Sequence, residues 1–260
     1  MHATEREKAI LDLLQQRGFI SFRELEKRVD ASAATLRRDL ERMSIEGRLD
    51  RVRGGAKLVK GSEAMLSEPH LAGTPMQENL ARNTKQKEAI GRAAAKLCEG
   101  NSAIMIDGGS TTLQMCRHLQ GLNLQVMTNS LPIVNALMQQ PRTRVLIPGG
   151  SVFREQNIVL AAVGEDLMPR FHAPKLFMGA AAVGARGVMQ ADVVLVAAER
   201  RLIERAEEVI LLVDSSKFQG SSGIVVCDLS EVDVVVTDKG IQKRDQQMLQ
   251  SAGIKLVVAD

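Results

Sequence analysis

The first 45 residues carry apolar side chains at helical spacing in three successive segments. Thr4 and Ser21 each precede a glutamate by three positions, which is the capping-box pattern, and Ser32 stands before the third segment. Gly18 and Gly47 mark the expected ends of the first and third helices. The apolar positions of the three predicted helices are Ile10, Leu11, Leu13 and Leu14, then Phe22, Leu25 and Val29, and then Leu36, Leu40 and Met43.

The spacing changes at residues 49–58, where apolar and basic residues alternate around Gly54 and Gly55. Alternation is the pattern of a strand, and a glycine pair suits a tight hairpin turn. Asp30 and Ala31 are suited to the turn between the second and third helices. Three helices followed by a basic hairpin are the layout of a winged helix–turn–helix, so we predict a DNA-binding domain over residues 1–58.

A second pattern follows a stretch without sustained periodicity. Residues 59–84 mix glycines and prolines with polar residues, and we predict a linker there with a short helix near its end. In residues 85–260, short apolar runs alternate with polar turns and segments of helical spacing. The strands are predicted at 103–106, 124–127, 145–147, 176–178, 209–213, 232–236 and 256–258. We therefore expect an α/β fold, with a mostly parallel sheet that helices cover on both faces.

Composition limits the class of protein. Hydrophobic residues make up 45% of the 260 residues and charged residues 25%, as in globular domains. Apolar runs are too short to cross a bilayer, and charges interrupt the first residues, so we expect a cytoplasmic protein without a membrane partner. Cys98, Cys116 and Cys227 lie far apart and the four histidines are dispersed, so we predict neither a metal site nor a cofactor.

The charge is unevenly divided between the two parts of the chain. Residues 1–60 hold 14 Lys and Arg against 10 Asp and Glu, whereas the remainder holds 20 against 21. A basic excess in the small N-terminal unit suits a phosphate-binding surface. The chain has six Phe and no Trp or Tyr, which argues against stacking platforms for RNA or single-stranded DNA. The expected nucleic-acid partner is double-stranded DNA.

The third predicted helix is the candidate reading element, because a recognition helix presents its first residues to base edges. Hydroxyls there can donate to phosphate or base, a small apolar side chain can meet a thymine methyl group, and an arginine can bridge O6 and N7 of guanine. Basic residues on the wing would hold phosphates or enter a minor groove. The residues predicted to contact DNA are Ser32, Ala34, Thr35, Arg37, Arg38, Arg51, Arg53 and Lys57. As an alternative, Arg37 and Arg38 form a solvated helix face paired with Asp39 and Glu41.

Polar and glycine-rich loops follow several of the predicted strands. Residues 107–112 combine glycines with three hydroxyls before a helix. Polar residues at 128–130, glycines at 149–150 and Lys217 follow other predicted strands in the same way. The carboxyl ends of parallel strands meet at one edge of a sheet, where ligands bind. Glycines let the backbone approach a ligand, and hydroxyls with a lysine suit an anion. Each loop alone is as well explained by helix capping; their convergence favours a pocket.

The head and the large domain both resemble the DeoR family of bacterial transcriptional repressors. The head matches in GFISFRELEKRVDASAATLRRDL and GRLDRVRGGA, and the large domain in IMIDGGSTT, VMTNSLPIVNAL, LIPGGSV, MGAAAVGARGV, EVILLVDSSKFQG and DVVVTD. The resemblance implies operator binding by residues 32–38 and a domain similar in fold to ribose-5-phosphate isomerase and glucosamine-6-phosphate deaminase. It further implies a phosphorylated sugar or related metabolite as effector. By position, the pocket residues are Asp107, Gly108, Gly109, Ser110, Thr111, Thr112, Asn129, Gly150 and Lys217.

The chain departs from the family pattern at two places. Members often have Ala-Gly after the aspartate, where this chain has Gly108 and Gly109, which loosens the loop. Many members carry acidic or polar residues before ERRLIERA, where residues 193–198 are apolar here. If those residues touch the sugar, the ligand of this protein is less hydroxylated or has a more apolar face.

Three hypotheses for the whole chain follow. The first is an effector-responsive transcriptional regulator, expected to be a dimer or tetramer because paired half-sites need paired heads. The second is a sugar-phosphate isomerase or deaminase fused to a DNA-binding head. We expect no catalytic residues, because Asp107, Asp192, Glu199 and Asp214 show no paired acid–base spacing. The third, an architectural DNA-binding protein, is disfavoured by the slightly acidic large domain.

Overall fold

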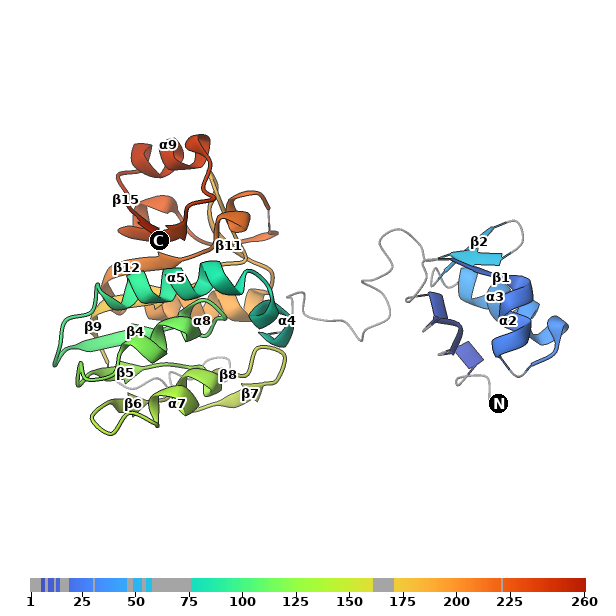
Figure 1. Ribbon diagram of the computed structural model, residues 1–260, viewed down its shortest axis with the longest axis horizontal. Helices are drawn as coiled ribbons and strands as arrows, with labels where there is room; N and C mark the ends of the chain where they lie inside the picture. The colour runs from blue at the N-terminus through green and yellow to red at the C-terminus, as the bar shows by residue number, and fades with distance from the viewer. Residues whose placement is uncertain are drawn as a thin grey trace. The chain divides into compact units, whose positions relative to one another are not determined.

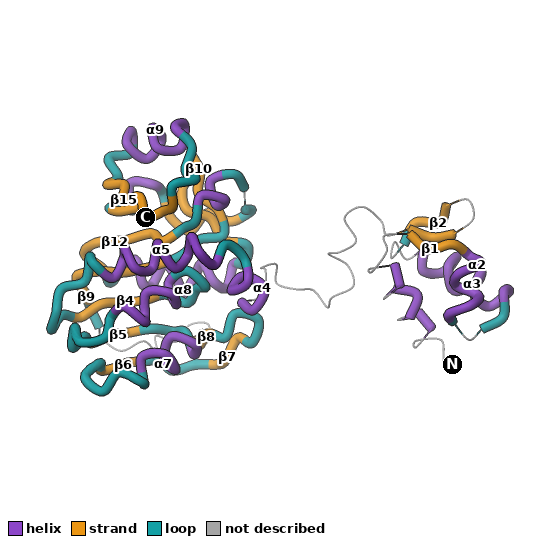
Figure 2. Tube along the Cα trace, in the orientation of Figure 1, coloured by secondary structure: helices purple, strands orange, loops and turns teal. Residues whose placement is uncertain are grey.

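The computed structural model describes residues 6–7, 9–11, 13–14, 19–29, 31–45, 49–52, 55–57, 76–160, 171–220 and 222–260. The chain divides into two compact units, Met1–His70 and Leu71–Asp260 (Figure 1). The smaller unit is mostly helical with one small sheet, and the larger alternates strands and helices (Figure 2). The domain limits expected from the sequence, 1–58, 59–84 and 85–260, stay predictions.

The smaller unit has the elements of a winged helix–turn–helix. A helical segment at 6–7, 9–11 and 13–14 is followed by β1 (Phe19–Ser21), α2 (Phe22–Arg28), α3 (Ala33–Ile45), β2 (Asp50–Val52) and β3 (Gly55–Lys57). The strands pair antiparallel in the order β1-β3-β2. Ser21 caps α2 by accepting from the backbone N–H of Glu24, as the capping-box pattern predicts. The apolar positions predicted for the three helices pack in one cluster.

A glycine is required where β1 and β3 pair. A Cβ atom on Gly55 would lie 2.2 Å from the carbonyl oxygen of Ile20. Gly55 belongs to the central strand and pairs with Ser21 in β1 and with Val52 in β2. The second glycine of the predicted wing is therefore fixed by this close approach, while residues 53 and 54 lie outside the described residues.

The larger unit is an α/β domain, which confirms the expected fold class. Its helices are α4 (Met76–Ala81), α5 (Thr84–Ala95), α6 (Thr112–Met115), α7 (Leu131–Leu137), α8 (Val193–Ile203) and α9 (Lys243–Ser251), with short 3-10 turns η2 (Cys116–His118), η3 (Ser215–Phe218) and η4 (Leu229–Glu231). Among the described residues, seven parallel strands form one sheet in the order β15-β14-β12-β9-β4-β5-β6. These strands are β4 (Ala103–Ile106), β5 (Gln125–Met127), β6 (Arg144–Leu146), β9 (Ala173–Met178), β12 (Ala206–Leu212), β14 (Val234–Asp238) and β15 (Lys255–Ala259).

Both faces of this sheet are buried, as the apolar runs predict. Ile104 and Ile106 of β4 pack with residues of α5, α6 and α7, whereas Met105 between them packs on the other face with residues of α8 and α9. The same alternation holds for β9, where Phe177 and Met178 belong to opposite clusters. Burial on both sides leaves the loops at the strand ends as the place for a site.

Two parts of the larger unit were not expected from the sequence. Strands β7 (Ser151–Phe153) and β8 (Ile158–Leu160) form an antiparallel hairpin. Strands β10 (Ala182–Gly184), β11 (Gly187–Gln190) and β13 (Ile224–Cys227) form a second antiparallel sheet. Helix α4, the short helix expected near the end of the linker, packs within this unit, since the N–H of Met76 donates to the carbonyl oxygen of Glu155 over 3.1 Å.

Candidate functional site

The ends of four parallel strands meet at one cavity of about 180 Å³. Its wall includes residues that directly follow β4, β5 and β9, and Lys217 of η3, which follows β12. From β4 the chain continues to β5 on one side, whereas β9 next to β4 leads to β12 on the other. The cavity therefore lies at the point where the strand order reverses, which is where ligands bind in open α/β sheets.

Seven of the nine residues that the family resemblance assigns to a pocket line this cavity. They are Asp107, Gly108, Gly109, Ser110, Thr111, Asn129 and Lys217. Thr112 does not line it: the side chain is buried, and its hydroxyl donates to the carbonyl oxygens of Asp107 and Gly109 over 2.8 and 3.0 Å. Gly150 does not line it either, because it is an exposed residue in the turn between β6 and β7. Thr112 thus shapes the loop, and Gly150 lies outside the cavity wall.

Most of the remaining wall comes from elements that the sequence did not connect with this edge. The further lining residues are Met76, Asn79, Gln156, Ile158, Gly179, Ala180, Ala181, Gln190, Ala191, Leu195, Ala198 and Glu199. Two of them, Leu195 and Ala198, belong to the apolar segment 193–198 that departs from the family pattern. Val193 and Val194 of that segment are exposed on α8 instead. The unusual apolar segment therefore contributes part of the cavity wall.

Asn129 connects the loops after β4 and β5. Its Nδ2 donates to Oδ1 of Asp107 over 3.2 Å, and its Oδ1 accepts from the N–H of Gly108 over 3.0 Å. Its own carbonyl oxygen accepts from the N–H of Val159 over 2.7 Å, which ties the β7–β8 hairpin to the same point. Both polar atoms of the buried amide have a hydrogen-bond partner, so this side chain holds the loop in place.

Gly108 is packed rather than loose. A Cβ atom at this position would lie 2.5 Å from Cγ2 of Ile158. Ile158 lines the cavity from β8, so the absence of a side chain at 108 lets the hairpin approach the loop. The expectation that a second glycine loosens the loop is therefore wrong: it makes room for Ile158.

Two carboxyl groups on the cavity wall resist ionisation. Burial raises the pKa of Asp107 to about 6, although hydrogen bonds from Gly108 and Asn129 act in the opposite direction. Burial, with the nearby charge of Asp107, raises the pKa of Glu199 well above its usual value. Among the described lining residues the cation is Lys217. The cavity thus combines one lysine, two carboxyl groups and several amides and hydroxyls.

Helix α4 is bound to the cavity wall by several contacts. Lys87 of α5 is buried and donates from Nζ to the carbonyl oxygen of Asn79, and its pKa is lowered, chiefly by burial. Asn83, between α4 and α5, adopts a left-handed backbone with φ of 51° and donates from Nδ2 to Oδ1 of Asp214 over 2.9 Å. Asp214 begins the η3 turn that carries Lys217. The first described helix of the larger unit is therefore joined to the cation-bearing loop.

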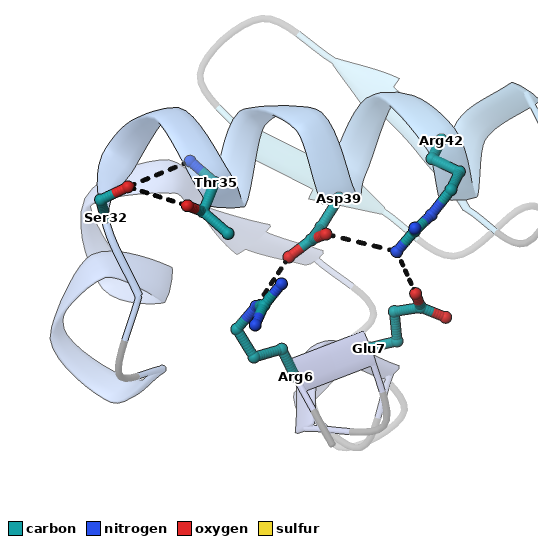
Figure 3. Close-up of polar contacts among 6 residues, drawn as sticks. All are labelled: Arg6, Glu7, Ser32, Thr35, Asp39 and Arg42. Carbon is teal, nitrogen blue, oxygen red and sulfur yellow. Dashed lines mark hydrogen bonds and ion pairs between the residues drawn. The ribbon is translucent and has the colours of Figure 1, made fainter. Parts of the chain in front are cut away.

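The start of α3 carries the residues expected to read DNA. The hydroxyl of Ser32 accepts from the N–H of Thr35 over 3.3 Å and lies 2.9 Å from the Thr35 hydroxyl (Figure 3). Ser32 is therefore the predicted cap of the helix. Ser32 and Ala34 are exposed and Thr35 is partly exposed. Their exposure leaves this end of the helix open to a groove.

Arg37 and Arg38 are exposed on the same helix. The guanidinium of Arg37 stands over the ring of Phe22, 5.1 Å from its centroid, which holds the side chain in place by a cation–π contact. The alternative pairing with Asp39 and Glu41 is not what the structure shows, because both acids have other partners among the described residues.

Asp39 belongs to a cluster that anchors α3. It is buried, accepts from Nε of Arg6 over 2.9 Å and lies 3.3 Å from Nη2 of Arg42, which also pairs with Glu7 (Figure 3). These ions join the first helical segment to α3 beside the apolar core that both elements share. The cluster positions the reading helix and does not neutralise its two arginines.

The wing residues are only partly described. Arg51 of β2 is exposed and its guanidinium lies 3.3 Å from the Glu41 carboxylate on α3. Such an exposed pair contributes little stability and can exchange for a phosphate. Lys57 ends β3, but its side chain lies outside the described residues, as does the whole of Arg53.

The fold and the two sites define a class: a DNA-binding protein with a winged helix–turn–helix head and a ligand-sensing α/β domain. The chain belongs to the DeoR family of transcriptional regulators. Residues 6–61 match the DeoR-like helix-turn-helix domain, and residues 82–239 match the DeoR C terminal sensor domain. The match to these two domains identifies the chain as a regulator and not as an isomerase or deaminase.

Similar proteins support the same assignment. The chain is 28% identical over 257 residues to the HTH-type transcriptional regulator UlaR of Escherichia coli O1:K1 / APEC, covering 99% of each chain. UlaR of Shigella boydii serotype 18 matches with the same identity and coverage. These matches extend over both domains of this chain.

Solved structures resemble parts of the chain at low identity. Ribose 5-phosphate isomerase A from Methanocaldococcus jannaschii is 18% identical, with 52% of this chain and 55% of that one covered and a TM-score of 0.39. The probable sor operon regulator from Shigella flexneri is 8% identical, with 68% and 86% covered and a TM-score of 0.40. In the described part of this chain, no helix has the length and apolar character needed to span a membrane.

Proposed function

We propose that the chain is a repressor of a carbohydrate-utilisation operon whose operator affinity is modulated by a phosphorylated sugar or a related metabolite. The observation that carries this proposal is the cavity at the reversal of strand order, with Lys217 and the 107–111 loop on its wall. A lysine beside backbone amides and hydroxyls suits a phosphate, and amide side chains suit the hydroxyls of a sugar. The pocket residues proposed are the seven that line the cavity.

The head would bind operator DNA through the exposed start of α3. Ser32, Ala34, Thr35, Arg37 and Arg38 are the proposed reading residues. Arg51, Arg53 and Lys57 are proposed to hold phosphates from the wing. Paired half-sites need two heads, so we propose a homodimer or tetramer that acts on chromosomal DNA in the cytoplasm.

Helix α4 is the element through which ligand binding would change the DNA affinity of the head. Met76 and Asn79 of α4 line the cavity, and α4 is the first described helix of the larger unit after the DNA-binding unit in the sequence. A ligand that binds more tightly in one position of α4 stabilises that position. Coupling of this kind is typically worth about 1–3 kcal/mol, or roughly 5- to 150-fold in DNA affinity.

A thermal-shift screen tests the proposed effector class. Purified full-length chain is heated with inorganic phosphate, pentose and hexose phosphates, and the matching unphosphorylated sugars. At least one sugar phosphate should raise the unfolding temperature, and the Lys217→Ala variant should lose that rise. A rise with the unphosphorylated sugar alone, or with none of the compounds, would reject the proposal.

A further inference from the structure

Glu199 has an unusual place on the cavity wall. It lies in α8, its side chain is only 3% exposed, and it lines the cavity. Nε2 of Gln190, at the end of β11, donates to its Oε1 over 2.6 Å. Its Oε2 is buried and has no hydrogen-bond partner among the described residues. A buried carboxyl oxygen without a partner costs free energy, so a group that enters the cavity and bonds to it gains affinity.

Among the described residues, no cation forms an ion pair with Glu199 that would compensate an ionised carboxylate. Asp107, which lines the same cavity, is itself acidic. Asp192, the cap of α8, accepts from the N–H of Val194 over 2.8 Å. Arg200 is held by Glu231 over 2.7 Å, and Cys227 of β13 is a buried thiol. Lys217 lines the same cavity, but its charge is not among those that change the pKa of Glu199.

With the amide nitrogen of Gln190 directed at Glu199, the hydrogen bond indicates which oxygen carries the proton. Oε1 accepts from an amide N–H, so Oε1 is the carbonyl oxygen of a neutral acid. The proton then lies on Oε2, the oxygen without a partner. A neutral carboxylic acid donates one hydrogen bond, whereas an ionised one only accepts.

We propose that Glu199 stands in the cavity as a neutral carboxylic acid and donates a hydrogen bond from Oε2 to an uncharged hydroxyl or carbonyl oxygen of the ligand. Glu199 is thus a specificity-determining residue that prefers a hydroxyl over an ammonium group at this position. The proposal rests on the proposed function, since it concerns the part of a phosphorylated sugar that lies away from Lys217.

The chemistry of the cavity favours an oxygen atom over an ammonium group. An ammonium group would require Glu199 to ionise beside Asp107, and two buried like charges repel. A ligand with a phosphate adds further negative charge to the cavity, which makes ionisation of Glu199 less favourable still. An oxygen acceptor needs no change of charge at Glu199.

A proton titration tests the neutral state without any ligand. Full-length chain is labelled at the glutamate side-chain carboxyl carbons with ¹³C, and Glu199→Gln identifies the signal by its loss. We expect the Glu199 signal to titrate well above the other glutamates. Titration together with the exposed glutamates would overturn the proposal, whatever binds to the cavity.

Matched ligands test the hydrogen bond. D-glucose 6-phosphate and D-glucosamine 6-phosphate differ by a hydroxyl against an ammonium group, and calorimetry above pH 7 measures each with wild type, Glu199→Gln and Glu199→Leu. Glu199→Gln keeps a neutral donor, so binding of the hydroxyl sugar should stay within about threefold, whereas Glu199→Leu should lose roughly tenfold or more. Glu204→Gln, an exposed change at the end of the same helix, should alter the binding of neither sugar phosphate.

The outcomes separate the two proposals. A rise of pH through the Glu199 titration should weaken ligand binding by the wild type and leave Glu199→Gln unchanged. Tighter binding of the amino sugar, lost in Glu199→Gln, would overturn the assignment of a neutral donor. If no sugar phosphate of the thermal-shift screen binds wild type although Glu199 titrates high, the proposed effector class fails while the neutral state of Glu199 stands.

Discussion

Asn129 and Asp107 lie 22 positions apart in the chain, and the amide Nδ2 of the first donates to Oδ1 of the second over 3.2 Å. They follow β5 and β4, which are neighbours in the sheet. The same amide accepts from the N–H of Gly108. One side chain therefore sets the shape of the loop and the orientation of the carboxylate.

Replacement of Asn129 should destabilise the larger unit. Asn129→Ala leaves the N–H of Gly108 and the Asp107 carboxylate without this partner, which should cost about 1–3 kcal/mol in the free energy of unfolding. Urea unfolding of the full chain measures this. Asn135→Ala, an exposed change on α7, should cost far less, and equal losses for both variants would contradict the role given to Asn129.

A side chain at position 108 should conflict with Ile158. Gly108→Ala should lose about 1–3 kcal/mol, because the added carbon meets a β-branched side chain that cannot turn aside freely. Ile158→Ala in the same chain should recover part of that loss. A double-mutant cycle gives the interaction free energy, and strictly additive losses would show that the two positions do not touch.

The pH dependence of stability should depend on Asp107. Its pKa is raised to about 6 in the folded state, so between its unfolded value and pH 6 the native state binds the extra proton. Stability should therefore fall as pH rises through this range and become level above it. Asp107→Asn removes this contribution, so the variant should gain stability relative to wild type as the pH rises from 4 to 7. A difference that stays constant or moves the other way would reject the raised pKa.

Arg38 should contribute to sequence reading. Arg38→Ala should weaken operator binding by about 1–3 kcal/mol if the guanidinium contacts a base, and the loss should be smaller on unrelated duplexes. Anisotropy titrations on a duplex selected by the protein from a random library measure both. Arg244→Ala removes the same charge from the exposed surface of the larger unit and serves as control. Equal losses on selected and unrelated DNA would reassign Arg38 to a phosphate.

The sequence predicted much of the site because its signals are local. Asp107, Asn129 and Lys217 each follow an apolar strand, and parallel strands bring such residues to one edge. The helical spacing around Leu36 and the cap at Ser32 likewise located α3 correctly, and its role as the reading helix stays a prediction.

The rest of the site depends on contacts that no local pattern contains. Gln190 and Glu199 meet because β11 belongs to a separate antiparallel sheet that packs beside α8, and neither segment shows this in its own residues. Ile158 reaches Gly108 through a hairpin whose strands have only three residues each. The sequence predicts Gly150 as a pocket residue because its loop is similar to the other glycine loops. Gly150 does not line the cavity, and it follows β6, the strand at the end of the sheet.

The most direct test of a metabolite-responsive regulator is the operator affinity with and without ligand. The full chain is titrated onto its selected duplex in the absence and presence of the sugar phosphate that gives the largest thermal shift. Wild type should change affinity by roughly 5- to 150-fold on adding ligand. The Thr111→Ala and Lys217→Ala double variant should bind DNA as wild type does without ligand and show no change with it, and Lys243→Ala should respond normally. A double variant that fails to bind DNA, or that still responds in full, would contradict the account.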